Sequence, residues 1–514
     1  MTAPVGGIGR RMAADTGQAA LGRIVTLGVW TLMLPVLLRG LGPEGFALWS
    51  LFFALTGHLS ALDLGLAPGT LRHVSAARAR DDGREAGEYA TLGIVGYVVL
   101  GAGWLALTPL LREPALDLLR IGVEQRGTAA WLVTLGPVAF ASLGASMILV
   151  TTLQGWGRFD LANGVTVSSI VVQAGGALWA LRHGHGLPGV VAASIVGTLA
   201  ATAVGFVLLR VGAPGFVWGS LRAASKRVRA VVAFGGPLQV GNVLAVAHQQ
   251  VDKLLLARYV TLAAVAPYEL GLRASTVMGS LPQQLLMVLV SAGARLHATG
   301  DAAGMRAVHD RTARWVMALT ASIAAGLVAG APRLLAVWVG EVPVGSDLAV
   351  VGLSLAMVAA IAAGPGGALA RALGRTRYEA EQSAVALVLH VALGLWAVPR
   401  YGLVGAVAAT ACANLVSSAW FMVRFARVTG WGVRALVVPA IAPVVALGVV
   451  GAAGRALSDL LPHATGIAGW GLALLVLALP AIVVVLTLTG TGFLPLAEWR
   501  ALRAASPQAP TTSR

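Results

Sequence analysis

The sequence predicts an all-α, polytopic membrane protein with about 14 transmembrane helices. Of its 514 residues, 57% are hydrophobic and only 11% are charged. A soluble domain carries about a quarter charged residues, so this chain could not cover a water-facing surface. The apolar residues form blocks such as 91–111 and 467–488, which are long enough to cross a bilayer as helices. The short alternating segments of a membrane barrel are not found.

Successive apolar blocks, separated by short polar loops, give the predicted spans in chain order. They cover 17–38, 45–66, 90–111, 128–152, 163–181, 188–211, 231–257, 262–294, 315–336, 348–372, 381–398, 402–424, 435–456 and 466–489. The first block is longer than a signal-peptide core and lacks a clear cleavage site, so we expect it to remain as a span. The only cysteine, Cys412, lies in an apolar block, which excludes a disulfide framework and a cysteine metal site.

The 37 basic residues are distributed unevenly between the two sides of these spans. Because the span ends are approximate, a basic residue within three positions of an end is counted with the adjoining loop, as Arg333 is with an opposite loop. The segments on the side of the N-terminus then hold 25 of them, the opposite loops hold nine, and three lie deeper inside spans. By the positive-inside rule, both termini are predicted to lie in the cytoplasm. The net charge of +16 therefore reflects topology and attraction to anionic lipid head groups, and it does not indicate a nucleic-acid partner.

An internal repeat divides the predicted spans into two sets of six. The pattern LWA…GLPGVVAAS in 178–194 returns as LWA…GLVGAVAAT in 395–410, at an offset of 216 to 217 residues. Because six is even, the two lobes run in the same direction, and we expect an axis along the membrane normal to relate them, with the substrate path between them. The predicted organisation is a six-helix lobe in 1–225, a second in 226–430, two further helices in 431–492 and a cytoplasmic tail in 493–514.

Three stretches carry a family resemblance. They are LGPEGFALWS in 41–50 with LDLGL in 62–66, LQGWGRFDLAN in 153–163, and QVDKLLLAR in 250–258. These stretches occur in this order, and the spans form two sets of six followed by two more. In both respects the chain resembles the oligosaccharide flippases of the multidrug/oligosaccharidyl-lipid/polysaccharide exporter superfamily. The resemblance implies a V-shaped, two-lobe transporter in the bacterial cytoplasmic membrane. It also implies a polyprenyl-diphosphate-linked oligosaccharide as substrate, for exopolysaccharide, capsule or O-antigen, with polysaccharide polymerase or export machinery as a candidate partner.

Motifs for catalysis and for cofactors are missing from the sequence. There is no G-x-x-x-x-G-K-[ST] loop, so transport is expected to use an ion gradient, a substrate gradient or consumption of the product. There is also no carboxylate pair, metal-spaced histidine cluster or nucleophile elbow, so neither an enzyme nor a cofactor is predicted. A membrane polymerase or ligase usually has a large periplasmic loop, whereas the longest predicted outward loop here is only 112–127.

The charged residues within spans are the first candidates for substrate binding, because a charge at membrane depth is costly. Arg23 offers paired donors to a diphosphate, although it could also extend to the cytoplasmic interface. Arg273 follows Glu269 by four residues on one helix face, which suits an internal ion pair or a phosphate contact. Lys253 is either an interfacial anchor or part of a release site.

Polar residues concentrate in the seventh and eighth spans. Glutamine and asparagine side chains there can bind sugar hydroxyls or join helices. The candidate cavity residues of this type are Gln239, Asn242, Gln249 and Gln283. Candidates for binding a coupling proton are His58, His248 and Asp252, since histidine changes charge near neutral pH. Packed, hydrogen-bonded histidines are the alternative interpretation.

Two other transport functions fit the same scaffold. An ion-coupled multidrug or organic-cation antiporter would favour an acidic cavity, whereas the charges within the predicted spans are three basic and three acidic. A flippase for the peptidoglycan lipid precursor is the second alternative.

Overall fold

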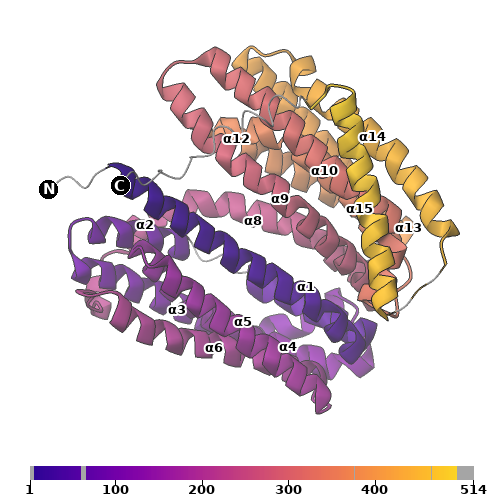
Figure 1. The fold of residues 1–514 in the computed structure, drawn as a ribbon. Coiled ribbons are helices and arrows are strands. Elements are labelled where there is room, and N and C mark those ends of the chain that lie inside the picture. The colour runs from indigo at the N-terminus through magenta and orange to yellow at the C-terminus, as the bar shows by residue number, and fades with distance from the viewer. Residues whose placement is uncertain (1–4, 59–64, 376, 463, 465, 495–514) are drawn as a thin grey trace, which may run out of the picture. The chain divides into compact units, whose positions relative to one another are not determined.

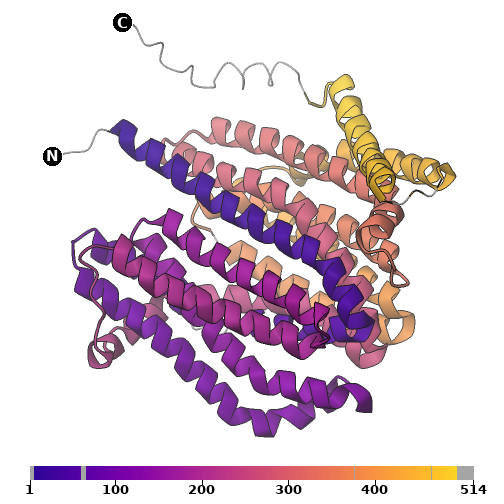
Figure 2. The same ribbon diagram turned by 60° about the horizontal axis from the view of Figure 1, so that its bottom comes forward.

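A computed structural model describes the backbone of residues 5–58, 65–375, 377–462, 464 and 466–494 (Figures 1 and 2). Inside helices, it leaves undescribed the side chains of 5–24, 27, 55, 57–58, 234–242, 245, 288 and 291. Every regular element in the described ranges is a helix. Ten of these helices are long and apolar enough to cross a membrane. The predicted class, an all-α polytopic membrane protein, is confirmed.

Two long helices each contain two of the predicted spans. The helix α1 (Val5–His58) is interrupted at Gly42 (φ 69°, ψ 172°), and α13 (Arg377–Thr429) is interrupted at Gly402 (φ 57°, ψ −130°). Glycine is suited to these positions because side chains with a Cβ disfavour positive φ. When each half is counted separately, the described part of the chain contains the 14 predicted spans, so this number is also confirmed.

The helices extend beyond the apolar blocks that predicted them. The helix α3 (Gly83–Leu118) ends only four residues before α4 (Val123–Gly155) begins, although the sequence predicted a longer loop there. Arg126 of α4 donates to Glu113 at 2.7 Å and to Asp117 at 2.8 Å, both on α3. Hydropathy detects only the part of a helix that lies in lipid, so polar extensions held by ion pairs escape it.

The chain divides into two compact units, Met1–Ala266 and Pro267–Arg514. The other helices of the first unit are α2 (Leu66–Arg78), α5 (Phe159–Arg182), α6 (Gly186–Gly212), α7 (Leu221–Ser225) and α8 (Val228–Tyr259), followed by the short 3₁₀ helix η2 (Leu262–Ala264). The predicted lobe boundary at residue 225 lies just before α8, whereas the compact unit continues through η2 to Ala266. The division into functional lobes at 1–225 and 226–430 stays a prediction.

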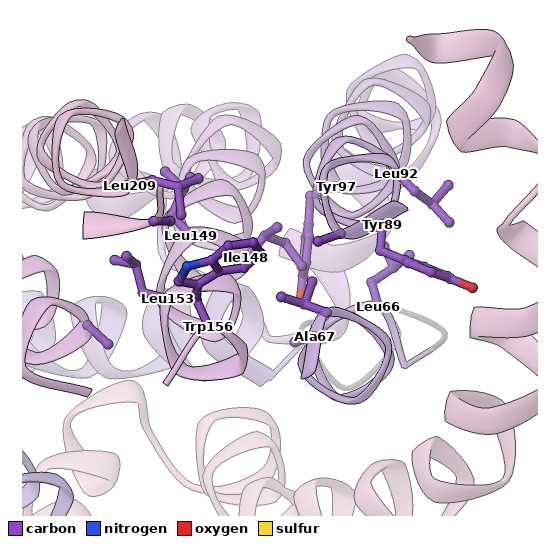
Figure 3. Close-up of a cluster of buried hydrophobic side chains, with 14 of the residues drawn as sticks. Leu66, Ala67, Tyr89, Leu92, Tyr97, Ile148, Leu149, Leu153, Trp156 and Leu209 are labelled. Carbon is purple, nitrogen blue, oxygen red and sulfur yellow. The ribbon is translucent and has the colours of Figure 1, made fainter. Parts of the chain in front are cut away.

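Close helix packing forms the core of the first unit. The side chains of Tyr97, Ile148, Leu149 and Leu209 are fully or almost fully buried in it (Figure 3). Tyr97 lies against Gly144, where an added Cβ would be only 2.0 Å from the tyrosine ring. A glycine on α4 thus lets α3 and α4 approach closely, and the aromatic ring fills the space between them.

The second unit is built around α10 (Ala302–Trp338). Its other helices are α9 (Val265–Ala298), which begins just before the unit boundary, α11 (Ser346–Ala362), α12 (Gly364–Ala372), α13, α14 (Val433–Leu460) and α15 (Gly466–Gly490). In the apolar stretch of α10 that could cross the membrane, 72% is buried inside the protein, compared with 50% or less in the other candidate spans. It packs against α11, α14 and α15 (Figures 1 and 2). The two additional helices are therefore an integral part of this unit.

Candidate functional site

A cavity of about 390 Å³ lies within the first unit, between α1, α4, α5 and α6. It is near the middle of α5 and α6, which places it at the depth of the bilayer core. We call it the polar–aromatic cavity. Its aromatic lining residues are Trp30, Phe52 and Phe53, and its polar ones are Thr26, Thr56, Ser146, Thr166, Ser169, Gln173, Ser194 and Thr198.

The aromatic side of the cavity is formed where the two halves of α1 meet. Trp30, before the Gly42 break, packs against Phe53, after it, with 6.4 Å between ring centroids. Trp49 lies 6.2 Å from Trp30 and 5.2 Å from Phe53, so the three rings form one cluster. The change of direction at Gly42 allows the two ends of this sequence segment to build one wall.

The polar side of the cavity comes mainly from α5 and α6. Gln173 donates from Nε2 to the Ser169 hydroxyl at 2.7 Å. The aliphatic part of the Gln173 side chain packs on Gly197 of α6, where an added Cβ would lie 2.4 Å from the Gln173 Cγ. Thr198 of α6 is hydrogen-bonded to Ser142 of α4 at 2.7 Å. Neighbouring helices thus hold the polar groups in place.

Most hydroxyl groups of the cavity donate to a backbone carbonyl of their own helix. Thr56 donates to Phe52 at 2.8 Å, and Ser194 donates to Val190 at 3.0 Å. A hydroxyl that donates in this way keeps oxygen lone pairs that can accept another hydrogen bond. The cavity wall therefore offers mainly acceptors, together with the Gln173 amide, in a neutral setting.

The described lining residues of this cavity include no charged side chain. Aromatic faces beside hydrogen-bonding groups suit a neutral ligand that has both an apolar face and hydroxyls. A nucleophile with its base, or a set of metal ligands, is likewise not found among these residues. The arrangement suits binding and passage of a polar, uncharged group.

Four of the predicted site residues have side chains outside the described part of the structure: Arg23, His58, Gln239 and Asn242. Their helices are described. Arg23 precedes Thr26 by three residues on α1, and His58 follows Thr56 by two. Their predicted functions stay predictions.

The predicted residues at the end of α8 lie within the first unit. Asp252 is fully buried, Lys253 is 5% exposed, and His248 is partly buried. Each of the three makes a noncovalent interaction within the protein. Gln249 is exposed. Its neighbour Gln250 is the only polar residue among those described around an apolar cavity of about 430 Å³ formed by α1, α3, α4 and α8.

The predicted residues of α9 belong to the second unit. Arg273 is partly buried and interacts electrostatically with Glu269, one turn earlier, as the sequence spacing suggested. Gln283 is exposed. Of the predicted residues with described side chains, none lines the polar–aromatic cavity.

Sequence analysis missed the residues that form this cavity. Thr166, Ser169 and Gln173 are spaced i, i+3 and i+7, so they share one face of α5. This polar stripe in an apolar span was a detectable signal. Trp30 and Phe53 gave no such signal, because they are separated in sequence and meet only through the break in α1.

The chain was compared with known protein families and with curated proteins. The family described as "Polysaccharide biosynthesis protein" matches residues 12–292, which is more than half of the chain. The chain belongs to this polysaccharide biosynthesis protein family. The match extends over α1 to α9 and so includes every helix that lines the polar–aromatic cavity. The search of curated proteins found no match.

Several solved structures similar to this polysaccharide biosynthesis protein are those of transporters. The lipid II flippase MurJ, in an inward closed conformation, aligns with a TM-score of 0.68 at 14% identity, over 94% of this chain and 99% of that chain. An inward-facing multidrug resistance MATE family transporter of the MOP superfamily gives a TM-score of 0.67 at 14% identity, over 81% of this chain and 99% of that chain. A MOP superfamily transporter from Pyrococcus furiosus gives a TM-score of 0.58 at 14% identity, over 81% of this chain and 95% of that chain. The predicted superfamily fold is confirmed.

Proposed function

We propose that this protein is a flippase for polyprenyl-diphosphate-linked oligosaccharide. In this proposal it moves the lipid from the cytoplasmic to the periplasmic leaflet of the bacterial cytoplasmic membrane, for the synthesis of a surface polysaccharide. Both termini lie in the cytoplasm, and the lobes 1–225 and 226–430 alternate in access. The family match supports a function in polysaccharide biosynthesis, and the similar solved structures support transport.

The observation that carries the proposal is the neutral chemistry of the polar–aromatic cavity. Sugars present hydroxyl groups around a ring whose faces carry C–H groups. Hydroxyl acceptors and the Gln173 amide on one side, with Trp30 and Phe53 on the other, match both parts of such a ring. The cavity lies where a sugar crossing the bilayer would otherwise lose its hydrogen bonds to water, which is costly. It therefore replaces those bonds during passage.

The diphosphate needs a different site, because the described lining of the cavity has no cation. Arg23, three residues before Thr26 on α1, is our candidate for holding it near the cytoplasmic entrance. Arg273 and Lys253 are proposed as further phosphate contacts, and Gln239, Asn242, Gln249 and Gln283 as sugar contacts. His58, His248 and Asp252 remain the candidates for binding a coupling proton.

The two alternative substrates differ from an oligosaccharide in charge. An organic cation would be stabilised by a carboxylate, and none lines the described part of the cavity. The peptidoglycan lipid precursor carries an ionised peptide, whose charges would be costly in the same neutral setting. Both considerations favour a neutral oligosaccharide.

The first experiment locates the lipid-linked oligosaccharide in cells depleted of this protein. Labelled lipid is probed on spheroplasts with a membrane-impermeant glycosidase. We expect the lipid to accumulate and to stay inaccessible from outside. If it reaches the outer leaflet as in the parent strain, the flippase proposal is wrong, and drug–ion antiport becomes the function to test.

A second experiment tests the cavity itself. The change Gln173→Leu removes its amide, and Thr487→Val is a control, because Thr487 lies exposed on α15 and within the described part of the chain donates only to its own helix. We expect Gln173→Leu to slow flipping about tenfold, consistent with the loss of one or two hydrogen bonds during passage. Equal rates for the two variants would contradict the assignment of the cavity to the sugar.

A further inference from the structure

A buried polar network lies inside the unit Pro267–Arg514, at a depth that the predicted spans place within the bilayer. His390, near the middle of the predicted span 381–398, is fully buried on α13. Its Nε2 lies 3.2 Å from the hydroxyl oxygen of Thr410, and that oxygen lies 3.4 Å from the hydroxyl oxygen of Tyr268 on α9. The network therefore connects α9 with both halves of α13, on either side of the Gly402 break.

The internal repeat relates this network to the polar–aromatic cavity of the first unit. The corresponding pairs, taken at offsets of 217, 216 and 216 residues, are Gln173 and His390, Ser194 and Thr410, and Thr198 and Asn414. The first member of each pair lines the polar–aromatic cavity. Each unit thus has polar side chains at the same places in its repeat.

The contacts follow this repeat as well as the sequence. Asn414 donates from Nδ2 to the Ala356 carbonyl of α11 at 3.3 Å, as Thr198 bonds to α4 in the first unit. The chemical difference lies at His390. The amide of Gln173 can only exchange hydrogen bonds, whereas an imidazole can also take up a proton near neutral pH.

The Thr410 hydroxyl can serve His390 in both protonation states. It lies within hydrogen-bond distance of two groups, His390 Nε2 at 3.2 Å and the Ala406 carbonyl at 3.1 Å. When Nε2 carries no proton, the hydroxyl donates to its lone pair. When Nε2 carries a proton, the imidazole donates to the hydroxyl oxygen, and the hydroxyl donates to Ala406. A proton can therefore be gained and lost without breaking this pair.

The helices around His390 carry other ionisable groups that act on its charge. Besides Tyr268, the described ones are Glu269, Arg273, Arg295 and His297 on α9, Asp347 on α11, Arg371 on α12, Arg434, Arg455 and Asp459 on α14, and Arg377, Tyr378, Glu379, Glu381, Arg400, Tyr401, Cys412, Arg424 and Arg427 on α13. Glu269 and Arg273 are the charged residues closest in sequence to the network, and they interact with each other. Their effects on a charged imidazole oppose each other, so the hydrogen bond to Thr410 has a direct part in holding the proton.

We propose that His390 is a proton-binding site, and that its protonation and deprotonation couple transport to a proton gradient. Ionisable residues within membrane spans are costly, and histidines there can carry protons in transporters. A charge on His390 strengthens its hydrogen bond to Thr410. The gain of a proton thus changes the interaction between the two halves of α13 and, through Tyr268, their interaction with α9. This inference rests on the proposed function, because it supplies the driving force for that transport.

The first test measures flipping of labelled polyprenyl-diphosphate oligosaccharide by the purified full-length protein in vesicles. The membrane potential is held at zero, and a gradient of one pH unit is either imposed or left out. We expect the gradient to raise the rate by up to about tenfold, since one pH unit is a factor of ten in the free energy of a single proton. Flipping that is insensitive to the gradient would overturn the coupling proposal and leave the flippase proposal intact.

The variant His390→Gln locates the proton site. Glutamine is the residue at the corresponding position of the first unit, and it keeps hydrogen bonding but cannot take up a proton. We expect this variant to flip lipid without any response to the gradient. His183→Gln is the matched control, because His183 is exposed at the end of α5, and it should respond as the natural protein does. A full response in His390→Gln would overturn the proposal.

A pair of changes at Thr410 guards against a folding defect in the His390 variant. Thr410→Ser keeps the hydroxyl and should keep the response to the gradient, whereas Thr410→Val removes the hydroxyl and should weaken it. Thermal unfolding identifies the variants that are stably folded. A stably folded Thr410→Val protein with the full response would overturn the function assigned to this hydrogen bond.

A second measurement detects the proton on His390 and does not depend on transport. NMR of the full-length protein with isotope-labelled histidine follows the imidazole signals between about pH 5 and pH 8. The signal that is missing from His390→Gln belongs to His390, and we expect it to change from the neutral to the charged form in this range. An imidazole that stays neutral throughout would overturn the proposal. A His390 that titrates in a protein unable to flip the lipid would support the proton site and contradict the proposed function.

Discussion

Arg333 of α10 holds the C-terminal end of α14 through Ser458. Its Nε donates to the Ser458 hydroxyl at 2.9 Å, and its Nη2 donates to the Ser458 carbonyl. The same guanidinium reaches the carbonyls of Leu461 at 2.6 Å and Pro462 at 2.9 Å. The last carbonyls of a helix have no partner within it, so one buried arginine satisfies several of them at once.

This interaction predicts a large loss of stability for Arg333→Met. The change leaves buried carbonyls without a donor, and each unsatisfied group costs about 1–3 kcal/mol. We expect a loss of about 3 kcal/mol or more in the free energy of unfolding, measured by thermal unfolding in detergent. The control is Arg400→Met, because Arg400 is exposed and, among the described residues, donates only to Trp396 of its own helix. Equal stability of the two variants would contradict the anchoring function of Arg333.

The contact between Gly144 and Tyr97 predicts a steric clash when the glycine is enlarged. In Gly144→Ala, the new Cβ would lie 2.0 Å from the fully buried ring of Tyr97. Overpacking of this kind costs about 1–3 kcal/mol, so the yield and thermal stability of the folded protein should fall. Gly103→Ala, where an added Cβ meets nothing within 4 Å, should be tolerated.

A double variant tests the cause of that clash. If the tyrosine ring is responsible, the combination of Tyr97→Leu with Gly144→Ala should cost less than the sum of the two single changes. Additive losses would show that the two positions act independently and that the packing explanation is wrong.

The environment of His73 predicts a loss of stability in mild acid. This residue lies in α2 outside the predicted spans and stacks on Tyr89, with 4.4 Å between ring centroids. Burial is the largest cause and lowers its pKa from the usual 6.5. The Ala230 backbone hydrogen bond, which comes next, and Glu85 raise the pKa, whereas the charges of Arg72 and Arg227 lower it further. Protonation is therefore harder in the folded protein than in the unfolded chain. The corresponding stability is present above pH 6.5 and declines as the pH falls below that value.

The measurement is thermal unfolding between pH 7.5 and 5.5. We expect His73→Gln to flatten the decline seen in the natural protein. His183→Gln serves as the control, because His183 is exposed at the end of α5. A decline of unchanged steepness in His73→Gln would assign the pH dependence to another group.

The aromatic wall of the cavity predicts a transport defect in Trp30→Leu. Leucine keeps an apolar side chain but removes the ring face against which a sugar can stack, so flipping should fall about tenfold. Trp470→Leu on α15 removes an indole that does not line the cavity, and it should leave flipping unchanged. A Trp30 variant that is folded and flips at the natural rate would remove this residue from the site.

The polar cluster at the beginning of α8 shows how ion pairs connect segments that are far apart in sequence. Arg227 donates from Nε to Glu88 of α3 at 2.8 Å, lies 3.3 Å from Glu85, and stacks over Tyr89. The hydrogen bond with Glu88 is the main cause of its raised pKa. In the sequence analysis, Arg227 was only one of the 25 basic residues on the side of the N-terminus. Its partners were not predictable, because they depend on how α3 and α8 pack.

The sequence by itself determined the class, the number and order of the spans, and the family of this protein. These features follow from a physical constraint that acts along the chain: every helix crossing a bilayer must be apolar over a minimum length, and basic residues mark one side. The Gly42 break falls between two predicted spans, and the Gly402 break coincides with the first residue of one, for the same reason. Local composition was sufficient for the class and the spans, whereas the family resemblance rested on the specific stretches in 41–66, 153–163 and 250–258.

Only the tertiary structure decided where the polar–aromatic cavity lies and what Arg333 contacts. Trp30 and Phe53 become neighbours through a break in α1, and Gln173 is held by a glycine of the next helix. Arg333, assigned from the sequence to an outward loop, is instead buried against Ser458. Sequence periodicity shows which face of a helix is polar, but not which helix that face meets. That choice depends on contacts between distant segments, which are formed only when the helices pack.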